Sequence, residues 1–501
     1  MNKIYKFLST NKLNILFTIC LMIFNIGIID KKIQNDTFFT IPTGIYILEN
    51  GIDEIEPFTY HENLKYIKLR WAFDVVVAKI YNTFSFEGLY VFVIIISMLI
   101  SVGLYNFLTN LNNNKTISFI ITLAIMLGLK EYLVCRAQII SYLLFAIEGF
   151  LLEKLLQTQK KKYILFLTII STLLVNFHSS VWLVFFLPFI PYFAEKLIYK
   201  LSTKKKIKFL NKFNIENINL KYLSITFVIC LLSGLISPLG INPYTYIFKV
   251  MNGVSKKFII ELQPSKLLST FPINIFIFFS ILILFLKRIK IKLSDFFLIL
   301  GFSIMSKLAV RNVFISIIFM AYPISRIINK IIKEYDKKLF FEKIDKFIEE
   351  NIIINILIFV SIFEFTLYNY KDIKYQEYVD EKTYPVELVK FMYRNIDIDT
   401  AKVYAEFDIS SYFEFSGIQT CLDSRTEVYC KEFSNVTILE DWYNLNYKEK
   451  NKVMDFIEKY DIKYLALYRT NSLADYLVYC KELYHDDYFV LYQVKKGEKN
   501  D

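Results

Sequence analysis

The sequence is poor in the motifs on which most soluble enzymes rely. It contains no glycine-rich phosphate-binding loop, no dinucleotide-binding fingerprint and no zinc-ligand spacing. Only three histidines occur, and none of the others lies close to His178, so a zinc site is not predicted. The six cysteines follow no metal pattern. Three lie in apolar runs, and Cys421, Cys430 and Cys480 lie in the polar tail, where one disulfide would leave one thiol over.

What the chain has instead is long apolar sequence. Of its 501 residues 55% are hydrophobic, and several runs are uncharged over about the 20 residues that a bilayer requires. The net charge is +11, but lysine and arginine lie mostly in short connections between the runs. This distribution is typical of a membrane protein facing anionic lipid, so nucleic acid is not a predicted partner. The N-terminal run, residues 14–29, has no cleavage site after it and is interpreted as a retained first span.

The apolar runs predict about eleven transmembrane helices. They cover residues 13–30, 86–107, 116–130, 134–154, 163–178, 180–198, 221–237, 271–287, 293–309, 311–329 and 351–369. The most basic connections, which begin at Lys160, Lys200, Lys287 and Lys330, then share one side with the N-terminus. The positive-inside rule makes that side cytoplasmic, and the odd number of spans places the C-terminus outside. We therefore expect a multi-pass protein of the cell membrane.

Two regions lie outside the predicted spans. The outer loop 30–85 contains amphipathic stretches at 41–48 and 71–81, which we expect to be interfacial helices. From about residue 370 charges and tyrosines become dense. Strand-like and helix-like runs then alternate at 402–405, 448–460, 464–468 and 488–494. We expect a transmembrane domain over residues 1–369 and an extracytoplasmic α/β domain over residues 370–501.

The outer loop holds the first candidate site residues. Asp36 follows the first span, where a carboxylate beside an apolar wall suits general-base work; a helix cap or a solvated loop position is the alternative. Asp53, Glu54 and Glu56 form an acidic cluster before a proline. They would bind a cation or act with Asp36, and a solvated turn is the alternative. A local ion pair is the preferred interpretation of Asp423 and Arg425 in the tail, and acceptor binding is the alternative.

Further polar residues fall at the same predicted face. Arg136 and Arg311 end two spans, where a guanidinium suits a phosphate, although snorkelling arginines also occur at such positions.

The remaining candidates on that face are substrate-binding residues. Asn176 and His178 end another span, and a lone histidine there is more often structural. Glu261 and Gln263 follow a turn and would bind sugar hydroxyls, or would be ordinary loop residues.

Taken in order, these segments resemble the bacterial C-type (GT-C) glycosyltransferases, and look most like an uncharacterised branch related to protein mannosyltransferases. The resembling segments are Asp36 to Gly44, Glu56-Pro57-Phe58-Thr59, Arg136-Ala137-Gln138, Asn176-x-His178, Pro238-Leu239-Gly240, Glu261-x-Gln263-Pro264, Arg311-Asn312 and Leu422 to Glu427. Two positions depart from the pattern. Phe39-Thr40 stands where Trp-His is usual, and Arg70-Trp71 stands where Glu-Trp is expected.

The resemblance implies transfer of a sugar from a polyprenyl-phosphate-linked donor to an envelope glycan, lipid or protein at the outer face. Asp36 would be the general base, with Glu56 as a second catalytic carboxylate, and Arg136 and Arg311 would hold the donor phosphate. No cofactor is implied, and a divalent metal stays compatible with the acidic loop. A lipid-linked glycan transporter and a non-catalytic scaffold are the alternatives. Against transport, we recognise no paired repeat and no set of charges at mid-depth in the spans.

Overall fold

The computed structural model describes residues 11–112, 114–203, 210, 212–253, 255–265, 290–335, 340–445, 450–471 and 480–495. The chain forms two compact units. The helical unit comprises Met1–Asp30, Tyr90–Tyr244 and Ile260–Tyr375. The loop–tail unit comprises Lys31–Leu89, Thr245–Ile259 and Gln376–Asp501. The outer loop, assigned from the sequence to the transmembrane domain, therefore packs with the tail.

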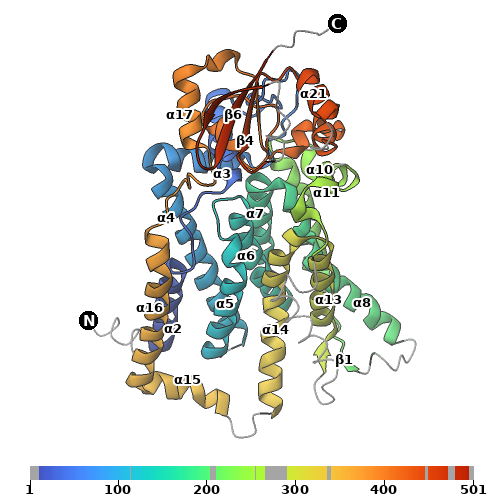
Figure 1. Cartoon of the computed structure of the whole chain (residues 1–501). Helices are drawn as coiled ribbons and strands as arrows, with labels where there is room; N and C mark the ends of the chain where they lie inside the picture. Colours follow the sequence, from blue (N-terminus) through green and yellow to red (C-terminus); the bar gives the residue numbers. More distant parts are fainter. Residues whose placement is uncertain are drawn as a thin grey trace. The chain divides into compact units, whose positions relative to one another are not determined.

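The helical unit is built from apolar helices that lie side by side (Figure 1). Its α-helices are α2 (Lys12–Ile26), the second part of α4 (Trp71–Asn112), α5 (Lys115–Leu129), α6 (Gln138–Thr158), α7 (Lys162–Phe177), α8 (Ile190–Ser202), α9 (Lys221–Ser233), α13 (Leu293–Leu308), α14 (Val313–Tyr335), α15 (Phe340–Glu350) and α16 (Ile352–Lys374). Short 3-10 segments join them: η1 (Lys130–Tyr132), η2 (Ser179–Phe189), η4 (Gly234–Ile236), η5 (Ile260–Leu262) and η6 (Val310–Asn312). Strands β1 (Phe213–Asn214) and β2 (Ile291–Lys292) pair in parallel.

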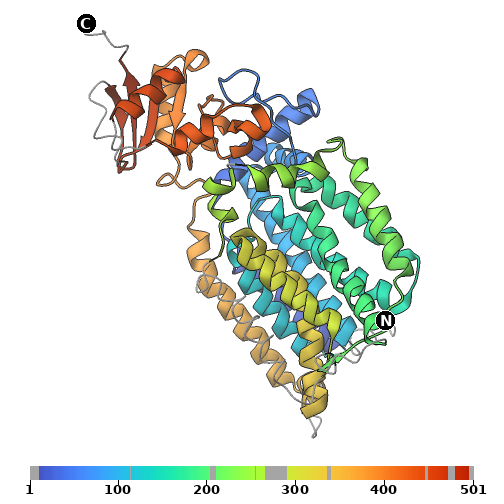
Figure 2. The same ribbon diagram turned by 90° about the vertical axis from the view of Figure 1, so that its right-hand side faces the viewer.

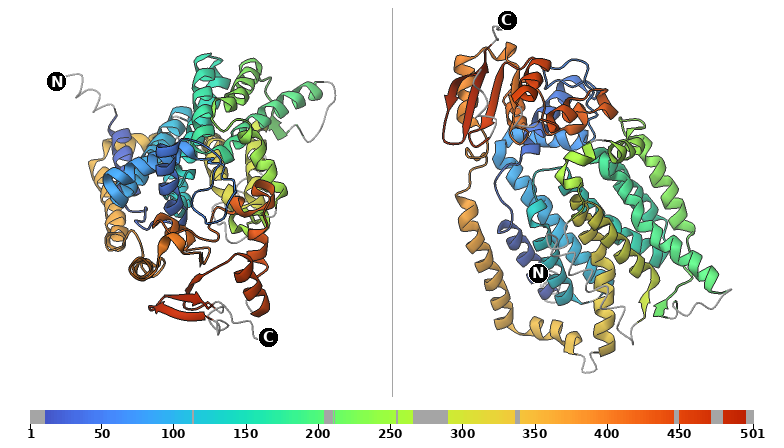
Figure 3. Two further views of the ribbon diagram at one scale, coloured as in Figure 1. Left: turned by 90° about the horizontal axis from the view of Figure 1, so that it is seen from above. Right: turned by 45° about the vertical axis from the view of Figure 1, so that its right-hand side comes forward.

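Interdigitating rings and a few polar links hold these helices together. Phe17 of α2 stacks on Phe119 of α5 with ring centroids 4.2 Å apart. Asn25 of α2 donates to the Ser101 hydroxyl of α4 at 2.8 Å, which satisfies an amide buried among apolar groups. The amphipathic helix α15 runs across between α14 and α16 (Figure 3), and its Asp345 accepts the backbone N–H groups that begin α5. That carboxylate satisfies donors that a helix start leaves open.

Every predicted span overlaps a helix except 271–287, which lies outside the described residues. Among the described helices, four are long and apolar enough to cross a membrane by length and composition, within Trp71–Leu111, Ser179–Ser202, Val310–Tyr335 and Ile352–Lys374. The apolar helices Lys12–Ile26, Lys162–Phe177 and Lys221–Ile236 are shorter. The protein is thus a helical membrane protein, and the full number of spans stays a prediction.

The second amphipathic stretch of the outer loop is helical, as expected. Residues 71–81 were predicted to form a helix separate from the span 86–107. The element labelled α4 joins two helices across Ser85, whose backbone is non-helical with φ 55°. The first of these helices contains residues 71–81, so the separation is confirmed, and a position of this helix along a membrane surface stays a prediction.

The loop–tail unit is a mixed α/β structure. Its sheet holds β3 (Val403–Ala405), β4 (Tyr464–Tyr468), β6 (Phe489–Val494) and β5 (Cys480–His485) in that order, with β3 and β4 parallel and the others antiparallel (Figure 2). Its helices and 3-10 segments are α3 (Asn35–Asn50), α11 (Ser255–Phe258), α17 (Val386–Asn395), η7 (Ile398–Thr400), α18 (Ser410–Phe415), η8 (Thr426–Tyr429), α19 (Lys431–Ser434), α20 (Ile438–Tyr443) and α21 (Lys450–Lys459); α10 (Asn242–Asn252) also falls largely in this unit. The predicted strands and helix of the tail are therefore present.

The outer loop is anchored to the tail along its length. Leu64 and Tyr66 belong to the same buried apolar cluster as tail residues such as Leu439 and Leu465. The Thr59 hydroxyl donates to the Thr420 carbonyl at 2.7 Å, beside a parallel bridge between the same two residues. Loop and tail thus share one core.

We predict the orientation of the chain from its basic connections. Single cysteines placed at exposed Lys161 and at exposed Asn435 should differ in intact cells, with a membrane-impermeant maleimide labelling position 435 and sparing position 161. Permeabilised cells should show both sites labelled. The parent chain is the control, because its cysteines are free and all but Cys480 are buried. Labelling at position 161 without labelling at position 435 would contradict the predicted orientation and support the opposite one.

Candidate functional site

Asp36 lies on a helix that is fixed by aromatic packing. It occupies the first turn of α3, where the positive end of the helix dipole favours a carboxylate, and Gln34 rather than Asp36 precedes the helix. Phe38 is fully buried, with its ring edge-on to Tyr384 at 4.7 Å and to Tyr412 at 5.1 Å. These contacts fix the helix start and leave Asp36 half-buried. A carboxylate held rigidly with partial access to solvent is suited to general-base work.

The acidic cluster of the outer loop is divided between two ion pairs. Asp53 accepts from the Lys68 ammonium at 2.6 Å and from the Tyr46 hydroxyl at 2.8 Å. Glu56 accepts from both ends of the Arg425 guanidinium, at 2.7 and 3.1 Å. No cluster of three or more metal-ligating side chains occurs among the described residues. Glu56, predicted to be catalytic, thus has a carboxylate that is buried and already bound.

Arg425 is the centre of a fully buried ionic network. Besides Glu56, its guanidinium donates to Glu414 at 2.9 Å and to Asp423 through Nε at 3.0 Å. The Tyr429 hydroxyl also donates to Asp423. The ring of Tyr66 lies 4.7 Å from the guanidinium carbon, measured to the ring centroid. The predicted Asp423–Arg425 pair is present, as part of a larger set.

The carboxylates of this network differ in their protonation. Burial alone would raise the pKa of Asp423, but the charge of Arg425 and hydrogen bonds from its neighbours lower it to about 2. Burial raises the pKa of Glu414 well above its usual range and raises that of Glu56, in both cases against the pull of Arg425. Asp423 is thus the permanent counter-ion, and Glu414 is the group that retains a proton.

A second buried cation, Arg70, lies in the same unit. Its guanidinium covers the Phe39 ring with 4.5 Å to the centroid, and Phe39 is one turn from Asp36 on α3. Its Nε lies 3.9 Å from a carboxylate oxygen of Asp74, too far for a hydrogen bond. Asp36 and Glu427 also interact with Arg70 electrostatically. From the sequence, Arg70 was only a departure from a family pattern.

In the helical unit, the predicted substrate-binding residue Glu261 forms an ion pair with Arg136, which was predicted to bind the donor phosphate. Arg136 donates to Glu261 at 2.8 Å. The Gln263 carbonyl accepts from the Val310 N–H at 3.1 Å, next to Arg311 in η6. Arg136, Glu261, Gln263 and the segment of Arg311 are therefore neighbours. Asp36 belongs to the other unit, so a shared site with these arginines stays a prediction.

The side chains of His178 and Asn176 form hydrogen bonds to neighbouring groups of the protein. The His178 ring is 5% exposed, and its Nδ1 lies 2.7 Å from the Ser141 hydroxyl. The Asn176 amide donates to the Thr172 carbonyl one turn earlier, at 2.8 Å. These contacts fit the structural alternative for His178, and substrate binding by either residue stays a prediction.

The helical unit also contains charges that were not recognised from the sequence. The Arg326 guanidinium lies 2.7 Å from Glu153 and donates to Asp295, while Tyr192 donates to Glu153 at 2.6 Å. Glu148 is fully buried, and neither carboxylate oxygen has a hydrogen-bond partner in the described part of the chain. Glu153, Asp295 and Arg326 lie near the ends of the predicted spans 134–154, 293–309 and 311–329, so the expectation that no set of charges occurs at mid-depth stays a prediction. These groups come from separate segments of the sequence, and only the fold brings their helices together.

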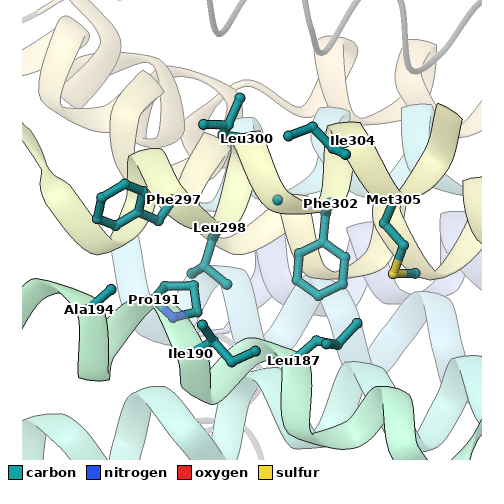
Figure 4. A pocket seen from close by; sticks show the side chains of 11 residues that line it. Leu187, Ile190, Pro191, Ala194, Phe297, Leu298, Leu300, Phe302, Ile304 and Met305 are labelled. Carbon is teal, nitrogen blue, oxygen red and sulfur yellow. The ribbon is translucent and has the colours of Figure 1, made fainter. Parts of the chain in front are cut away.

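One described cavity is purely apolar. It has a volume of about 290 Å³ and lies between the η2–α8 segment and α13, where Leu187, Ile190, Phe297 and Phe302 line it (Figure 4). Such a lining offers nothing to a sugar or a phosphate and suits a hydrocarbon chain.

Comparison with solved structures shows the fold. The chain matches the archaeal oligosaccharyltransferase AglB from Archaeoglobus fulgidus, in complex with an inhibitory peptide and a dolichol-phosphate, with a TM-score of 0.59 and 12% identity over 92% of this chain and 70% of that one. A second structure of the Archaeoglobus fulgidus oligosaccharyltransferase, tethered to an acceptor peptide, gives a TM-score of 0.54 and 11% identity over 92% of this chain and 69% of that one. No family model and no curated protein matches. The chain therefore shares the fold of these oligosaccharyltransferase structures, and membership of the GT-C glycosyltransferases, including the narrower mannosyltransferase-related branch, stays a prediction.

The protonation of the Arg425 network predicts opposite outcomes for two similar substitutions. Glu414→Gln should leave stability within about 1 kcal/mol, because a neutral amide replaces a carboxyl that already carries a proton. Asp423→Asn should cost roughly 3 kcal/mol or more, because it leaves Arg425 buried without its ionised partner. Thermal unfolding of the full-length protein in detergent measures both. Equal losses for the two variants would contradict this assignment of the proton.

Proposed function

We propose that this protein is a membrane glycosyltransferase that moves a sugar from a polyprenyl-phosphate-linked donor to an acceptor of the cell envelope. The observation that carries the proposal is the fold, which follows an oligosaccharyltransferase solved with dolichol-phosphate over 92% of this chain. The half-buried carboxylate of Asp36 at the start of a rigid helix supports it further. Because fold alone does not fix chemistry, the residues below carry the mechanism.

In the proposed reaction, Asp36 accepts the proton of an acceptor hydroxyl. The acceptor oxygen then forms a bond to the anomeric carbon, while the bond from that carbon to the lipid phosphate oxygen breaks and its electrons remain on the phosphate. A single displacement of this kind inverts the anomeric configuration. Arg136 and Arg311 would stabilise the departing phosphate electrostatically. Glu56 would contribute through the Arg425 network, which binds its loop to the tail.

The Arg136–Glu261 pair gives the donor site a defined resting state. Their atoms are 2.8 Å apart, and the exposed fractions of their side chains are 21% and 43%. A lipid phosphate that binds Arg136 must displace the Glu261 carboxylate or share the guanidinium with it. Glu261 would therefore compete with the phosphate, in addition to any contact with the sugar.

A polyprenyl chain would accompany the phosphate. The cavity between the η2–α8 segment and α13 (Figure 4) has the apolar lining that such a chain requires. Its residues belong to the same unit as Arg136 and Arg311.

Transport of a lipid-linked glycan is the second candidate function. The buried charges Glu153, Asp295 and Arg326 favour it, because ionisable groups inside membrane spans often mark a transport pathway. This alternative predicts no dependence on Asp36.

Asp36→Asn should abolish transfer, because an amide cannot accept the acceptor proton at neutral pH. Cells that lack the gene should be complemented with wild type, with Asp36→Asn and with Glu49→Gln, which removes an exposed carboxylate from the other end of α3. Mass spectrometry of the envelope glycans should show the added sugar with wild type and the control only. Restoration by Asp36→Asn at equal protein level would exclude Asp36 as the base and favour transport or a scaffold.

Two substitutions at the resting pair should change lipid-phosphate affinity in opposite directions. Arg136→Lys should weaken binding of farnesyl phosphate about tenfold, because an ammonium lacks the bidentate fork. Glu261→Gln should strengthen it, because the competing charge is removed. Microscale thermophoresis on the detergent-solubilised protein, with farnesol as the neutral control, measures both. Weaker binding by Glu261→Gln would show that Glu261 assists the phosphate site.

A further inference from the structure

Among the described residues of the loop–tail unit, the cations Lys68 and Arg425 are buried and Arg70 is nearly so, and they differ in how many of their hydrogen-bond donors have an acceptor. The Lys68 ammonium is 0% exposed and donates to an Asp53 carboxylate oxygen and to the carbonyls of Asp53 and Ile55, at 2.6 to 3.1 Å. Arg425 is 1% exposed and donates to three carboxylates. Both cations have acceptors on all sides, as buried charges require, and both are structural.

Arg70 differs from both. It presents five N–H donors, and its guanidinium donates no hydrogen bond within the described part of the chain. Its nearest carboxylate oxygen, on Asp74, is 3.9 Å away, and 15% of its side chain remains exposed. A nearly buried guanidinium with unfilled donors and an exposed edge requires an acceptor from outside the described residues, and water or a ligand would supply it.

The surroundings hold Arg70 in place without filling its donors. Phe39 lies beneath the guanidinium at 4.5 Å, and Asp74, one turn along the chain, lies on its buried side. Both Asp74 carboxylate oxygens are buried and have no hydrogen-bond partner among the described residues. Asp74 therefore lies beside the guanidinium and interacts with it electrostatically without accepting any of its hydrogen bonds. The Asp74 carbonyl also packs against Gly44, where a Cβ would come within 2.0 Å, so the start of α4 is pressed onto α3.

The acidic groups around Arg70 leave it able to attract an anion. Three acids, Asp74, Asp36 and Glu427, interact with Arg70 electrostatically. Burial raises the pKa of Glu427, which favours its neutral form. Arg425 and Lys68 add positive charge to the surroundings of Asp74. An anionic group arriving at the open edge of Arg70 thus meets a fixed cation beside Asp36.

We propose that Arg70 is an anion-binding residue of the Asp36 site, and that it takes a phosphate or carboxylate oxygen of the substrate through the open edge of its guanidinium. The assignment rests on the proposed function for its substrate, and its chemistry is shared by two sources. The anion is either the phosphate of the donor lipid or an acidic group on the acceptor, next to the hydroxyl that Asp36 deprotonates. Without Arg70, such a group would face Asp36 as a like charge.

Equilibrium binding to the full-length protein in detergent tests the proposal without turnover. Farnesyl phosphate against farnesol represents the donor, and glucuronate against glucose represents an acidic acceptor. Wild type should prefer the anionic member of at least one pair. Arg70→Gln should weaken that anion about 10- to 100-fold, and Arg70→Lys, which keeps the charge and loses the planar fork, should lie between the two. Lys79→Gln, an exposed cation on the same helix, should bind as wild type does.

The outcomes separate the two sources and the two hypotheses. A loss confined to glucuronate assigns the anion to the acceptor, a loss confined to farnesyl phosphate assigns it to the donor, and a loss of both supports a site that takes either. Equal affinity of Arg70→Gln and wild type for every probe would overturn the proposal. If Arg70→Gln does not fold, the affinities of Arg70→Lys for the same probes test the proposal, and equal affinities of Arg70→Lys and wild type would then overturn it. Failure of the glycosyltransferase hypothesis would appear in the Asp36→Asn glycan profile and would leave these binding constants unchanged.

Discussion

The buried guanidinium of Arg425 is the interaction on which the loop–tail unit depends. A charge without water costs several kcal/mol unless it is paired, and no single carboxylate could satisfy all five of its donors. Two regions distant in sequence therefore have to meet, since Glu56 comes from the outer loop, whereas Glu414 of α18 and Asp423 belong to the tail and lie close to Arg425 in the sequence. If the outer loop separated from the tail, the buried Arg425 guanidinium would lose its Glu56 partner. The tail is thus part of the support that holds α3, and Asp36 with it, rather than an appended domain.

Satisfaction of buried charges separates structural groups from candidates for function in both units. Lys68 and Arg425 are saturated with acceptors, and the same holds in large part for Arg326 between Glu153 and Asp295. Arg70 and Arg136 retain some exposure and face acids that are distant or replaceable. A group whose hydrogen bonds are complete has little free energy to gain from a ligand, whereas an incompletely bonded one gains the full benefit of a charge-assisted contact. By this criterion Glu56 and His178 fit supporting roles, while Arg70 fits the proposed contact with an anion.

The sequence predicted those features that depend on local pattern. Apolar runs located the helices of the helical unit, because each must bury or expose a continuous apolar surface, and short strand-like runs located β3, β4 and β6 of the tail. The Asp423–Arg425 pair was also foreseen, because its members are two residues apart. Contacts between distant segments were not. Glu414 gave no sign of meeting Glu56, and Glu153, Asp295 and Arg326 lie in separate segments whose contact the sequence does not show. The break at Ser85 was located from the sequence, because the amphipathic stretch 71–81 ends just before the predicted span that begins at residue 86.

The same reasoning explains why Arg70 had no visible meaning in the sequence. In the sequence, Arg70 follows Lys68 by two residues in a basic stretch and resembles any other charged loop residue. Because the family pattern has glutamate at that position, the arginine suggests that a functional residue is missing. In the fold, α3 and the start of α4 are pressed together at Gly44, and the turn just before α4 places the Arg70 guanidinium over the ring of Phe39, one turn from Asp36. An acid and a cation held by two packed segments form a more rigid arrangement than either residue would form alone. Under the proposed function, an arginine in place of the expected acid changes the charge that this site offers to a substrate.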